Sequence, residues 1–384
     1  MSLKAAQRAV EDVAPDLVAL SHFVHAHPEI GYEEFESAEA VARAAEAAGF
    51  VVERAVAGRE TAFRATKGHG ELVVAYCAEY DALPDVGHAC GHNIIAAASL
   101  GAAIGLAAVA DEIGVTVQLL GTPSEEGGGG KIDLINAGYF DGVHAAMMVH
   151  PWPDERLDAT CLAVDHFDVV YEGKEAHASA APYEGINALD ALTIAQVAVG
   201  LLRQQLHPGD QVHSIIVEGG VAANIIPRRA VGRYMARSVT AERLAELRQR
   251  LNACFEAGAL ATGARLSVNE LGQPFSHMET DPDLLRLYRR AAEARGRRFE
   301  RDDAGAPKPT ISTDMANVSL VVPSIHPLLA IPTDGAVNHQ PEFTAACVTP
   351  EADAAVIDGA VMLAHTAIAA ATDPALRARL LERS

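Results

Sequence analysis

Basic residues are scarce in this sequence. Its 384 residues include 30 lysines and arginines against 51 aspartates and glutamates, which gives a formal net charge of -21. An acidic surface repels phosphate backbones and anionic lipid headgroups. We therefore expect neither nucleic acid nor a membrane as a partner. The hydrophobic share of 49% still indicates an ordered globular protein.

Cysteine is also rare, with an odd count of 5 and no pair spaced as CxxC. A disulfide framework is therefore not expected, and a reducing cytoplasm is the expected location. The first residues, MSLKAAQRAVEDVAPD, carry charges throughout and lack the apolar core of a secretory signal. This composition favours the same location.

Long hydrophobic runs are limited to the segment Ile94–Ala110, which is almost wholly apolar. It is slightly shorter than the roughly 20 residues that cross a bilayer. It lacks basic flanks, and Asp111 and Glu112 follow it directly. We interpret it as a buried helix that packs through alanine and glycine.

Short apolar segments alternate with helical periodicity in the first part of the chain. Leu72–Ala78, Val115–Leu120 and Ala145–Val149 are predicted strands, and helical patterns lie between them. This alternation predicts an α/β domain with a mostly parallel sheet. From Asp281 onward helices and strands alternate again, so the chain is predicted to return to this domain.

The middle of the chain has a different order of elements. Strand and helix patterns follow one another as βαββαβ, which is typical of a ferredoxin-like unit. We therefore predict a catalytic domain from residues 1–163 and 275–384, with an inserted domain from 164–274. The elements predicted in the insertion are Asp165–Glu172, Asn187–Leu206, Val212–Val217, Val231–Ala236, Thr240–Ala261 and Arg265–Leu271.

The stretch GHACGHN contains Cys90 and His92, whose thiolate and imidazole suit zinc or a similar divalent ion. The alternative is a buried cysteine between two solvated histidines, and short motifs often match by chance. Asp81, in EYDALP, follows a strand. It fits either a carboxylate that orients a metal-bound imidazole or a turn-forming residue.

The loop GTPSEEGGGGK places Glu125 and Glu126 next to each other after a strand. One such carboxylate can bind a metal while its neighbour takes a proton from water. A solvated acidic turn is the alternative. A phosphate-binding loop is excluded, because Glu125 and Ile132 stand where that motif requires glycine and a hydroxyl residue.

Two single histidines, His150 before Pro151 and His339 in NHQPEF, also follow predicted strands. Each taken alone is more typical of a structural residue. Together with Cys90 and Glu126, however, they lie near strand C-termini, where open α/β sheets bind ligands. Their convergence favours a metal site at that edge.

The predicted insertion carries its own candidates. His177 lies in KEAHASAAP and Asn224 in GGVAANIIP, and both side chains can donate a hydrogen bond to a developing oxyanion. Arg237 can bind a carboxylate through two hydrogen bonds, and Arg233 is a rival for that role. Without a metal site, a surface histidine, a turn asparagine and solvated arginines would be the simpler interpretation.

These stretches resemble the dinuclear metallopeptidase family that contains aminoacylases, carboxypeptidase G and indole-acetyl-amino-acid hydrolases. The sequence looks closest to the branch with p-aminobenzoyl-glutamate hydrolase and the β-alanyl-lysine-type dipeptidases. The matching stretches run in the family's order from His25 to Phe343. They are HAHPEIGYEE, EYDALP, GHACGHN, GTPSEEGGGGK, His150, KEAHASAAP, GGVAANIIP, STDMANVS and NHQPEF.

The resemblance implies a zinc-peptidase-like catalytic domain that binds two divalent ions, with zinc expected and manganese or cobalt as alternatives. It also implies an inserted domain through which two copies form a homodimer. Carried over by motif, Cys90 would bridge the two ions, His92 and His150 would complete one site, and Glu126 and His339 would complete the other.

For catalysis, the resemblance implies that Glu125 is the general base and that Asp81 orients a ligand. His177 and Asn224 would contact substrate, in the same subunit or from the partner, and Arg237 would bind its carboxylate. The expected reaction is hydrolysis of the amide bond of an N-acyl amino acid or dipeptide by a metal-activated water, with Glu125 taking the proton.

Two features of the sequence, a short loop and one residue, depart from the family pattern. The loop between Pro84 and Gly87 is very short compared with the plant-hormone-conjugate branch, which weakens an auxin-conjugate assignment. Position 93 is Asn where many relatives have Asp, and a change beside the ligands is expected to alter metal affinity or choice.

Two other functions remain open at this point. The chain can be a non-catalytic metal-binding regulatory or partner subunit, although every expected ligand and the base are present. Alternatively, Cys90 can act as a nucleophile with His92 or His88 as its base. Cys90 and His92 are only two residues apart on one loop, which suits a shared ion better than a nucleophile and its base.

Overall fold

The computed structural model describes residues 1–382. The chain forms two compact units. The first unit comprises Met1–Thr160 and Met278–Ser384, and the inserted unit comprises Cys161–His277. The predicted domain boundaries, after residues 163 and 274, lie close to these divisions. Each unit has a hydrophobic core of its own.

Within residues 1–382, the first unit is built on a six-stranded sheet in the order β1-β2-β4-β3-β5-β13. Strands β4, β3, β5 and β13 run parallel to one another, whereas β1 pairs with β2, and β2 with β4, in antiparallel fashion. The bounds are β1 Val51–Arg54, β2 Phe63–Lys67, β3 Leu72–Ala78, β4 Val115–Gly121, β5 Ala145–Met147 and β13 Ser324–Ile325.

The predicted α/β class with a mostly parallel sheet is therefore confirmed. Within residues 1–382, three of the five strand pairings in this sheet are parallel, and the two antiparallel pairings of β2 make the sheet mixed. The sequence-based assignment contained no strand between residues 51 and 67, and this segment supplies the two antiparallel strands. The central strand β3 is apolar along nearly its whole length and buried on both faces. Such a strand is typical of a parallel sheet covered by helices on each side.

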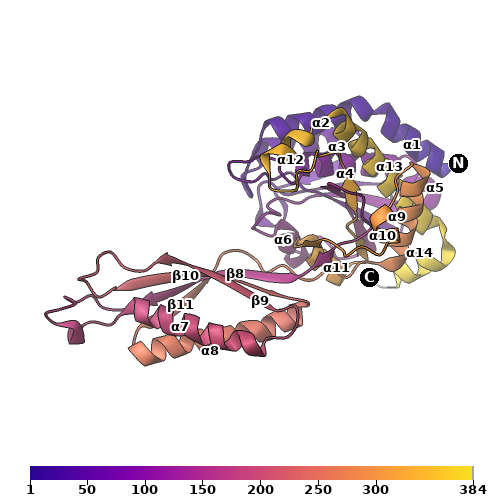
Figure 1. Ribbon diagram of the computed structural model, residues 1–384. Coiled ribbons are helices and arrows are strands. Elements are labelled where there is room, and N and C mark those ends of the chain that lie inside the picture. The colour runs from indigo at the N-terminus through magenta and orange to yellow at the C-terminus, as the bar shows by residue number, and fades with distance from the viewer. Residues whose placement is uncertain (383–384) are drawn as a thin grey trace. The chain divides into compact units, whose positions relative to one another are not determined.

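Helix α4 (His92–Ala107) is the apolar segment that the sequence suggested, and nearly every residue in it is buried. It packs against α13 (Pro350–Thr372), and the two helices lie together in the first unit (Figure 1). By length and composition α13 is apolar enough to cross a membrane, but 72% of its most apolar window is buried inside the unit. Both helices therefore form the interior of the first unit.

A separate two-stranded parallel sheet joins β6 (His150–Trp152) to β14 (Leu328–Ala330). The prediction placed His150 at the end of a single strand of the main sheet, but that strand is interrupted after Met147. The remaining helices of the first unit are α1 Ser2–Asp12, α2 Ala14–Ala26, α3 Phe35–Ala47, α5 Ala110–Ile113, α6 Gly130–Asn136, α9 Pro282–Ala294, α10 Glu300–Asp303, α11 Met315–Val321, α12 Pro341–Ala346 and α14 Pro374–Leu381.

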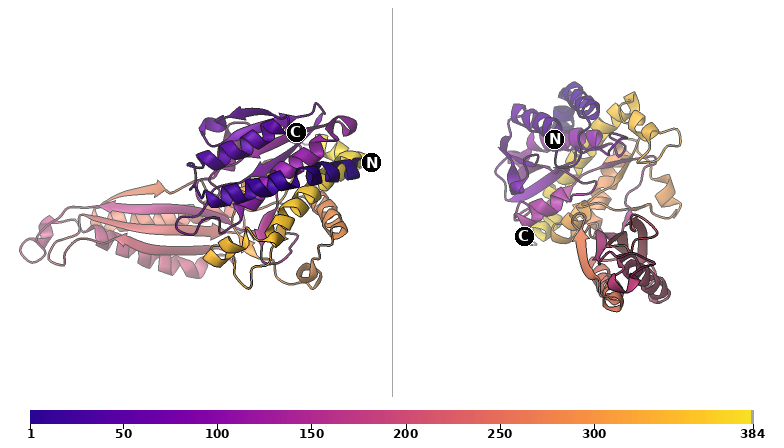
Figure 2. Two further views of the ribbon diagram at one scale, coloured as in Figure 1. Left: turned by 90° about the horizontal axis from the view of Figure 1, so that it is seen from above. Right: turned by 90° about the vertical axis from the view of Figure 1, so that its left-hand side faces the viewer.

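The inserted unit has the predicted βαββαβ order. Its sheet is antiparallel, in the strand order β11-β8-β10-β9, and both helices cover one face of it (Figure 2). The Asn187 side chain caps the first helix by accepting hydrogen bonds from the backbone N–H groups of Leu189 and Asp190. The elements are β8 Ala163–Glu172, α7 Ala188–Leu202, β9 Gln211–Glu218, β10 Arg229–Ser238, α8 Ala241–Thr262 and β11 Arg265–Glu270.

Candidate metal centre

The chemically active loops of the first unit follow strands that run side by side. The loop after β3 carries Asp81, Cys90 and His92, the loop after β4 carries Glu125 and Glu126, and β5 leads directly to β6. Because these strands are parallel, their carboxyl ends meet at one edge of the sheet. The structure brings the loops after β3 and β4 together at this edge, as the sequence predicts.

The turn at Gly91 sets the positions of Cys90 and His92. Gly91 lies just before α4 with φ of 74°, a left-handed conformation that glycine adopts without steric cost. A Cβ atom at this position would also lie only 2.8 Å from Cγ of Pro151. A glycine between the cysteine and the histidine is therefore required for two independent reasons.

Asp81 has the geometry expected of an orienting carboxylate. Nδ1 of His92 lies 2.9 Å from the Asp81 carbonyl oxygen and 3.0 Å from its Oδ1. The other oxygen, Oδ2, accepts a hydrogen bond of 3.0 Å from the backbone N–H of Glu126. Asp81 therefore fixes the His92 ring through Nδ1 and leaves Nε2 of that ring facing away from Asp81. The same residue fixes the loop that carries Glu126.

His339 reaches the same place from a distant part of the chain. Its backbone N–H donates to the carbonyl of Ala89, beside Cys90, at 3.0 Å. Its Nε2 lies 3.9 Å from Oε2 of Glu126, and its φ of 72° is unusual for a residue other than glycine. His150 presents its ring edge-on to His92, with 6.0 Å between ring centroids.

Two sets of donor atoms share the sulfur of Cys90. Cys90, His92 and His150 form one set, and Cys90, Glu126 and His339 form the other. Within each set the donor atoms lie within 4.8 Å of one another. In residues 1–382, Nε2 of His92 and Oε1 of Glu126 are buried without a hydrogen-bond partner. Unpaired buried donors of this type fit a metal ion, so the residues are suitable for a pair of divalent cations.

Burial and neighbouring charges shift the pKa values of the donor residues in different directions. Burial raises the pKa of the Cys90 thiol well above its usual range, and the nearby Glu126 raises it further. Burial lowers the pKa of His92, but the charge and hydrogen bond of Asp81 outweigh burial, so the net pKa is well above normal. Burial and the neighbouring His326 lower the pKa of His150 to about 3.

Glu125 is buried between other acidic groups. Burial raises its pKa well above the usual range, and the charges of Glu79 and Glu126 add to this effect. The surroundings of Cys90 argue against a nucleophilic thiol, because a reactive thiolate requires positive charge nearby and Cys90 instead faces Glu126. The acidic environment is more suitable for cations than for a free thiolate.

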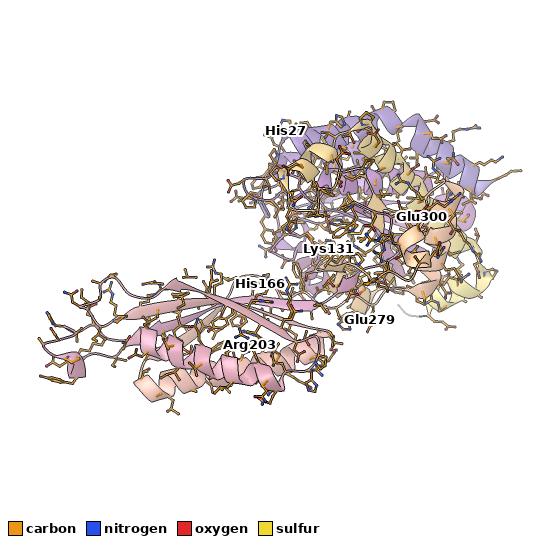
Figure 3. All side chains as sticks on the ribbon, in the orientation of Figure 1. His27, Lys131, His166, Arg203, Glu279 and Glu300 are labelled. Carbon is orange, nitrogen blue, oxygen red and sulfur yellow. The ribbon has the colours of Figure 1, made fainter. Side chains whose placement is uncertain are left out.

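A buried ion network beside Glu125 was not predicted from the sequence. Nζ of Lys131 lies 2.5 Å from both Oε1 of Glu79 and Oδ1 of Asp314, and all three side chains are fully buried. Figure 3 shows Lys131 inside the first unit. Oε2 of Glu79 lies 3.5 Å from Nε2 of His92, which links the network to the donor residues. Each of the three residues lies in a stretch that resembles the family pattern: EYDALP, GTPSEEGGGGK or STDMANVS. This resemblance was the sequence signal by which the network could have been found.

Asn93 and His88 lie near the candidate ligands, and their surroundings differ from those that the sequence suggested. The Asn93 side chain donates to Oγ of Ser21 at 2.8 Å and to the Cys347 carbonyl at 3.0 Å, so it links helices in the core. An aspartate could not donate these bonds. His88 is buried, and burial together with the charges of His92 and His25 lowers its pKa to about 3.

The remaining predicted residues lie in the inserted unit. His177 and Asn224 are exposed, and the Nδ1 atom of His177 accepts a hydrogen bond from the backbone N–H of Ser179. Arg233 pairs with both carboxylate oxygens of Asp168, at 2.8 and 2.9 Å, so this rival is already engaged. Arg237 is half-buried, and burial lowers its pKa.

Comparison with known proteins covers nearly the whole chain. A family model described as peptidase family M20/M25/M40 matches residues 75–367. Xaa-Arg dipeptidase of Mus musculus is 39% identical over 97% of this chain and 89% of its own length. One of the subunits of p-aminobenzoyl-glutamate hydrolase from Escherichia coli strain K12 is 34% identical over 62% of this chain and 53% of its own length.

Solved structures share the fold at lower identity. A dinuclear metal-binding peptidase of the M20 family from Bacillus subtilis superposes with a TM-score of 0.69 and 21% identity, over 94% of this chain and 98% of its own. A putative aminohydrolase from methicillin-resistant Staphylococcus aureus gives a TM-score of 0.75 at 19% identity, over 94% and 99% of the two chains.

Proposed function

Because the chain belongs to peptidase family M20/M25/M40 and is a metal-dependent hydrolase of amide or peptide bonds, we propose that it is a dinuclear dipeptidase. The proposed substrate is a dipeptide with a basic C-terminal residue. The match to Xaa-Arg dipeptidase, which covers 97% of this chain, supports this choice. A net charge of -21 favours the approach of a cationic substrate.

The observation that carries the proposal is the sharing of one sulfur by two donor sets. Cys90 lies within 4.8 Å of the donor atoms of His92 and His150 on one side and of Glu126 and His339 on the other. Thiolate, imidazole and carboxylate together suit zinc, which is the metal we propose. Two divalent cations held there would make water nucleophilic, polarise the amide carbonyl and offset the acidic charge of the site.

Glu125 is the proposed general base. Its carboxylate takes a proton from the attacking water and then passes it to the leaving amine. Asp81 holds the His92 ring through Nδ1 and holds the Glu126 backbone N–H, so one carboxylate keeps a ligand of each donor set in register. The presence of a base beside both donor sets favours an enzyme over a non-catalytic metal-binding subunit.

The roles of His177, Asn224 and Arg237 as substrate contacts remain proposals. Arg233 is held by two hydrogen bonds to Asp168, which makes it the weaker candidate for the carboxylate anchor. Replacement of Arg237 with Met is expected to raise KM for a dipeptide while leaving the metal content unchanged.

We further propose a homodimer formed through the inserted unit. Strand β9 lies at the edge of the sheet, and Ile215, Ile216 and Val217 in it are 62%, 49% and 51% exposed. Helix α7 exposes Val197 and Leu201, at 59% and 71%. An open strand edge with apolar side chains is a typical pairing surface.

A cytoplasmic location is part of the same proposal, as is the lack of nucleic-acid and membrane partners. A cysteine that binds metal must stay reduced, and the cytoplasm keeps thiols reduced. The acidic net charge supports the expectation on partners.

Metal analysis together with a hydrolysis panel tests the function. The chelated protein, reloaded with zinc, is offered alanyl-arginine, alanyl-lysine, alanyl-glutamate, N-acetyl-arginine and p-aminobenzoyl-glutamate. We expect two ions per chain, loss of turnover on chelation, recovery with zinc, and the highest kcat/KM for alanyl-arginine. Turnover that resists chelation but is abolished by alkylation would contradict the metal mechanism, and a preference for p-aminobenzoyl-glutamate would contradict the substrate proposal.

A further inference from the structure

The residue before the proposed base has an unfavourable backbone conformation. Ser124 has φ of 56°, in the left-handed region that residues with a Cβ atom rarely adopt. This conformation is unfavourable in a residue other than glycine, because its Cβ atom lies too close to the following carbonyl oxygen. Glu125 and Glu126 follow immediately, so the conformation of Ser124 decides where both carboxylates are directed. Strain of this kind often occurs at functional loops.

Glu34 holds the strained residue from a distant part of the chain. Its Oε1 accepts a hydrogen bond of 2.7 Å from the backbone N–H of Ser124. The Ser124 carbonyl accepts from the backbone N–H groups of Gly128, at 3.1 Å, and Gly129, at 2.8 Å. Of these three bonds, the one that Glu34 accepts involves a side chain, and a bond to a carboxylate is about twice as strong as a neutral one.

The segment that carries Glu34 fits closely around the Ser124 side chain. A Cβ atom on Gly31 or on Gly128 would overlap with Oγ of Ser124, so both positions require glycine. The stretch from Gly31 to Glu34, within HAHPEIGYEE, therefore contacts the loop through both its backbone and its carboxylate. The sequence alone gave no role for this stretch.

The position of Glu34 is costly for stability. The residue is completely buried, at 0% exposure. Burial, together with the charge of Asp81, raises its pKa to about 7. A carboxyl group placed in the interior beside another carboxylate weakens the fold. Retention of such a group is easier to explain by the position it imposes on the loop than by stability.

We propose that Glu34 is a positioning residue for catalysis, which holds Ser124 in the left-handed conformation so that Glu125 is directed at the metal centre. This inference rests on the proposed role of Glu125 as the base. Glu34 does not belong to the two donor sets that share Cys90, and it reaches the acidic loop through the backbone of Ser124.

Steady-state kinetics with alanyl-arginine test the proposal. Glu34→Ala removes the acceptor, and we expect kcat to fall on the order of 10- to 100-fold, because a shift of about 1 Å in a catalytic group has an effect of this size. KM and zinc content are expected to remain close to those of the wild type. Glu34→Gln keeps an acceptor oxygen at the same place, so it is expected to retain kcat within about threefold.

A second substitution separates positioning from a general loss of structure. Glycine adopts positive φ freely, so in the Ser124→Gly background the effect of Glu34→Ala on kcat should fall to about threefold. Ser124→Ala is the matched control, because it removes the hydroxyl group but keeps the Cβ atom. In that background the full effect of Glu34→Ala is expected to remain. An equal effect of Glu34→Ala in all three backgrounds would overturn the proposal.

Amide hydrogen exchange gives a result that does not depend on the substrate. In zinc-loaded Glu34→Ala, deuterium uptake should increase in a peptide covering residues 122–130 and stay unchanged in one covering β11. Unchanged uptake in 122–130 would overturn the proposal, even if the wild type cleaves dipeptides. Failure of the wild type to cleave any substrate would instead count against the proposed function. If Glu34→Ala folds neither alone nor with Ser124→Gly, Glu34 belongs to the core, and the proposal is wrong.

Discussion

Lys131 is the residue whose surroundings differ most from what its chemistry suggests. An ammonium group in the interior is unfavourable unless it is paired, and Lys131 is paired twice, with Glu79 and with Asp314. Burial lowers its pKa, but Asp314 and Glu79 more than compensate and raise it well above the usual range. The group therefore stays charged and separates carboxylates that would otherwise repel one another.

Replacement of Lys131 with Met is expected to destabilise the protein by roughly 3–5 kcal/mol, because two buried carboxylates lose their partner. Differential scanning calorimetry of the metal-free protein measures the effect. Lys4→Met, at an exposed position, is the control and should leave the midpoint unchanged. A loss below about 1 kcal/mol for Lys131→Met would show that the network contributes little to folding.

Glu125→Gln is the sharpest test of the base. The amide cannot take a proton from water, so kcat should fall by a factor on the order of 1,000 or more. Metal content should stay at the wild-type value, since Glu125 belongs to neither of the two donor sets that share Cys90. Glu60→Gln, at an exposed position, serves as the matched control. Near-normal turnover by Glu125→Gln would exclude the assigned role.

At the scale of single residues, the sequence indicated the donors and the orienting Asp81, but not the buried network of Lys131. Cys90, His92, Glu126, His150 and His339 belong to types that bind metals and follow strand ends. Glu79 and Lys131 do not stand out in this way, because a carboxylate and an ammonium are usually solvated. Only the fold shows that both are buried against each other.

Helix α4 and helix α13 determine the architecture of the first unit. Gly101 of α4 lies so close to α13 that a Cβ atom on it would be 2.7 Å from Cβ of Ala360, and it would also be 2.8 Å from Cδ1 of Leu17 in α2. Small residues thus allow the two helices to pack closely. The sequence predicted a buried helix rich in alanine and glycine, and this prediction is confirmed.

Gly101→Ala is accordingly expected to lower stability by about 1–3 kcal/mol through overpacking. On helix propensity alone the same change would stabilise the helix by roughly 1 kcal/mol. Overpacking would lower the unfolding midpoint and helix propensity would raise it, so calorimetry shows which effect is larger. A raised unfolding midpoint would show that α4 and α13 are less closely packed than described.

The antiparallel strands β1 and β2 show where element prediction was incomplete. Strand β1 has the burial pattern exposed, intermediate, exposed, exposed, so its sequence VVER has little to distinguish it from a loop. Strands at the border of a sheet are held by pairing with a neighbour rather than by a strong pattern of their own. Because β2 pairs with β4 in antiparallel fashion, the sheet contains both parallel and antiparallel pairs.

For the whole molecule, the inserted unit is the part that the catalytic chemistry does not explain. It has a core of its own and an exposed apolar surface on α7 and β9. Helix α7 packs over β8 and β10, whereas α8 also packs against β11, which lies at the opposite edge of the sheet from β9. This arrangement supports the proposed homodimer.

The double substitution Val197→Glu and Leu201→Glu should convert the dimer to a monomer. Size-exclusion chromatography with light scattering is expected to give twice the chain mass of 40.3 kDa for the wild type and the single chain mass for the variant. Leu260→Glu is the control, because Leu260 is 88% exposed but lies on α8. A variant that remains dimeric would place the interface elsewhere.

The α/β class, the inserted βαββαβ unit, the family and the set of candidate metal donors could all be predicted from the amino-acid sequence. These properties depend on residue type, periodicity and order along the chain, which are local and can be read directly. Four other features are visible in the folded chain alone: the donors that meet around Cys90, the mixed sheet, the buried Lys131 network and the contact of Glu34 with Ser124. Each of these joins residues far apart in the chain, and only the packing of helices and strands brings such residues within bonding distance.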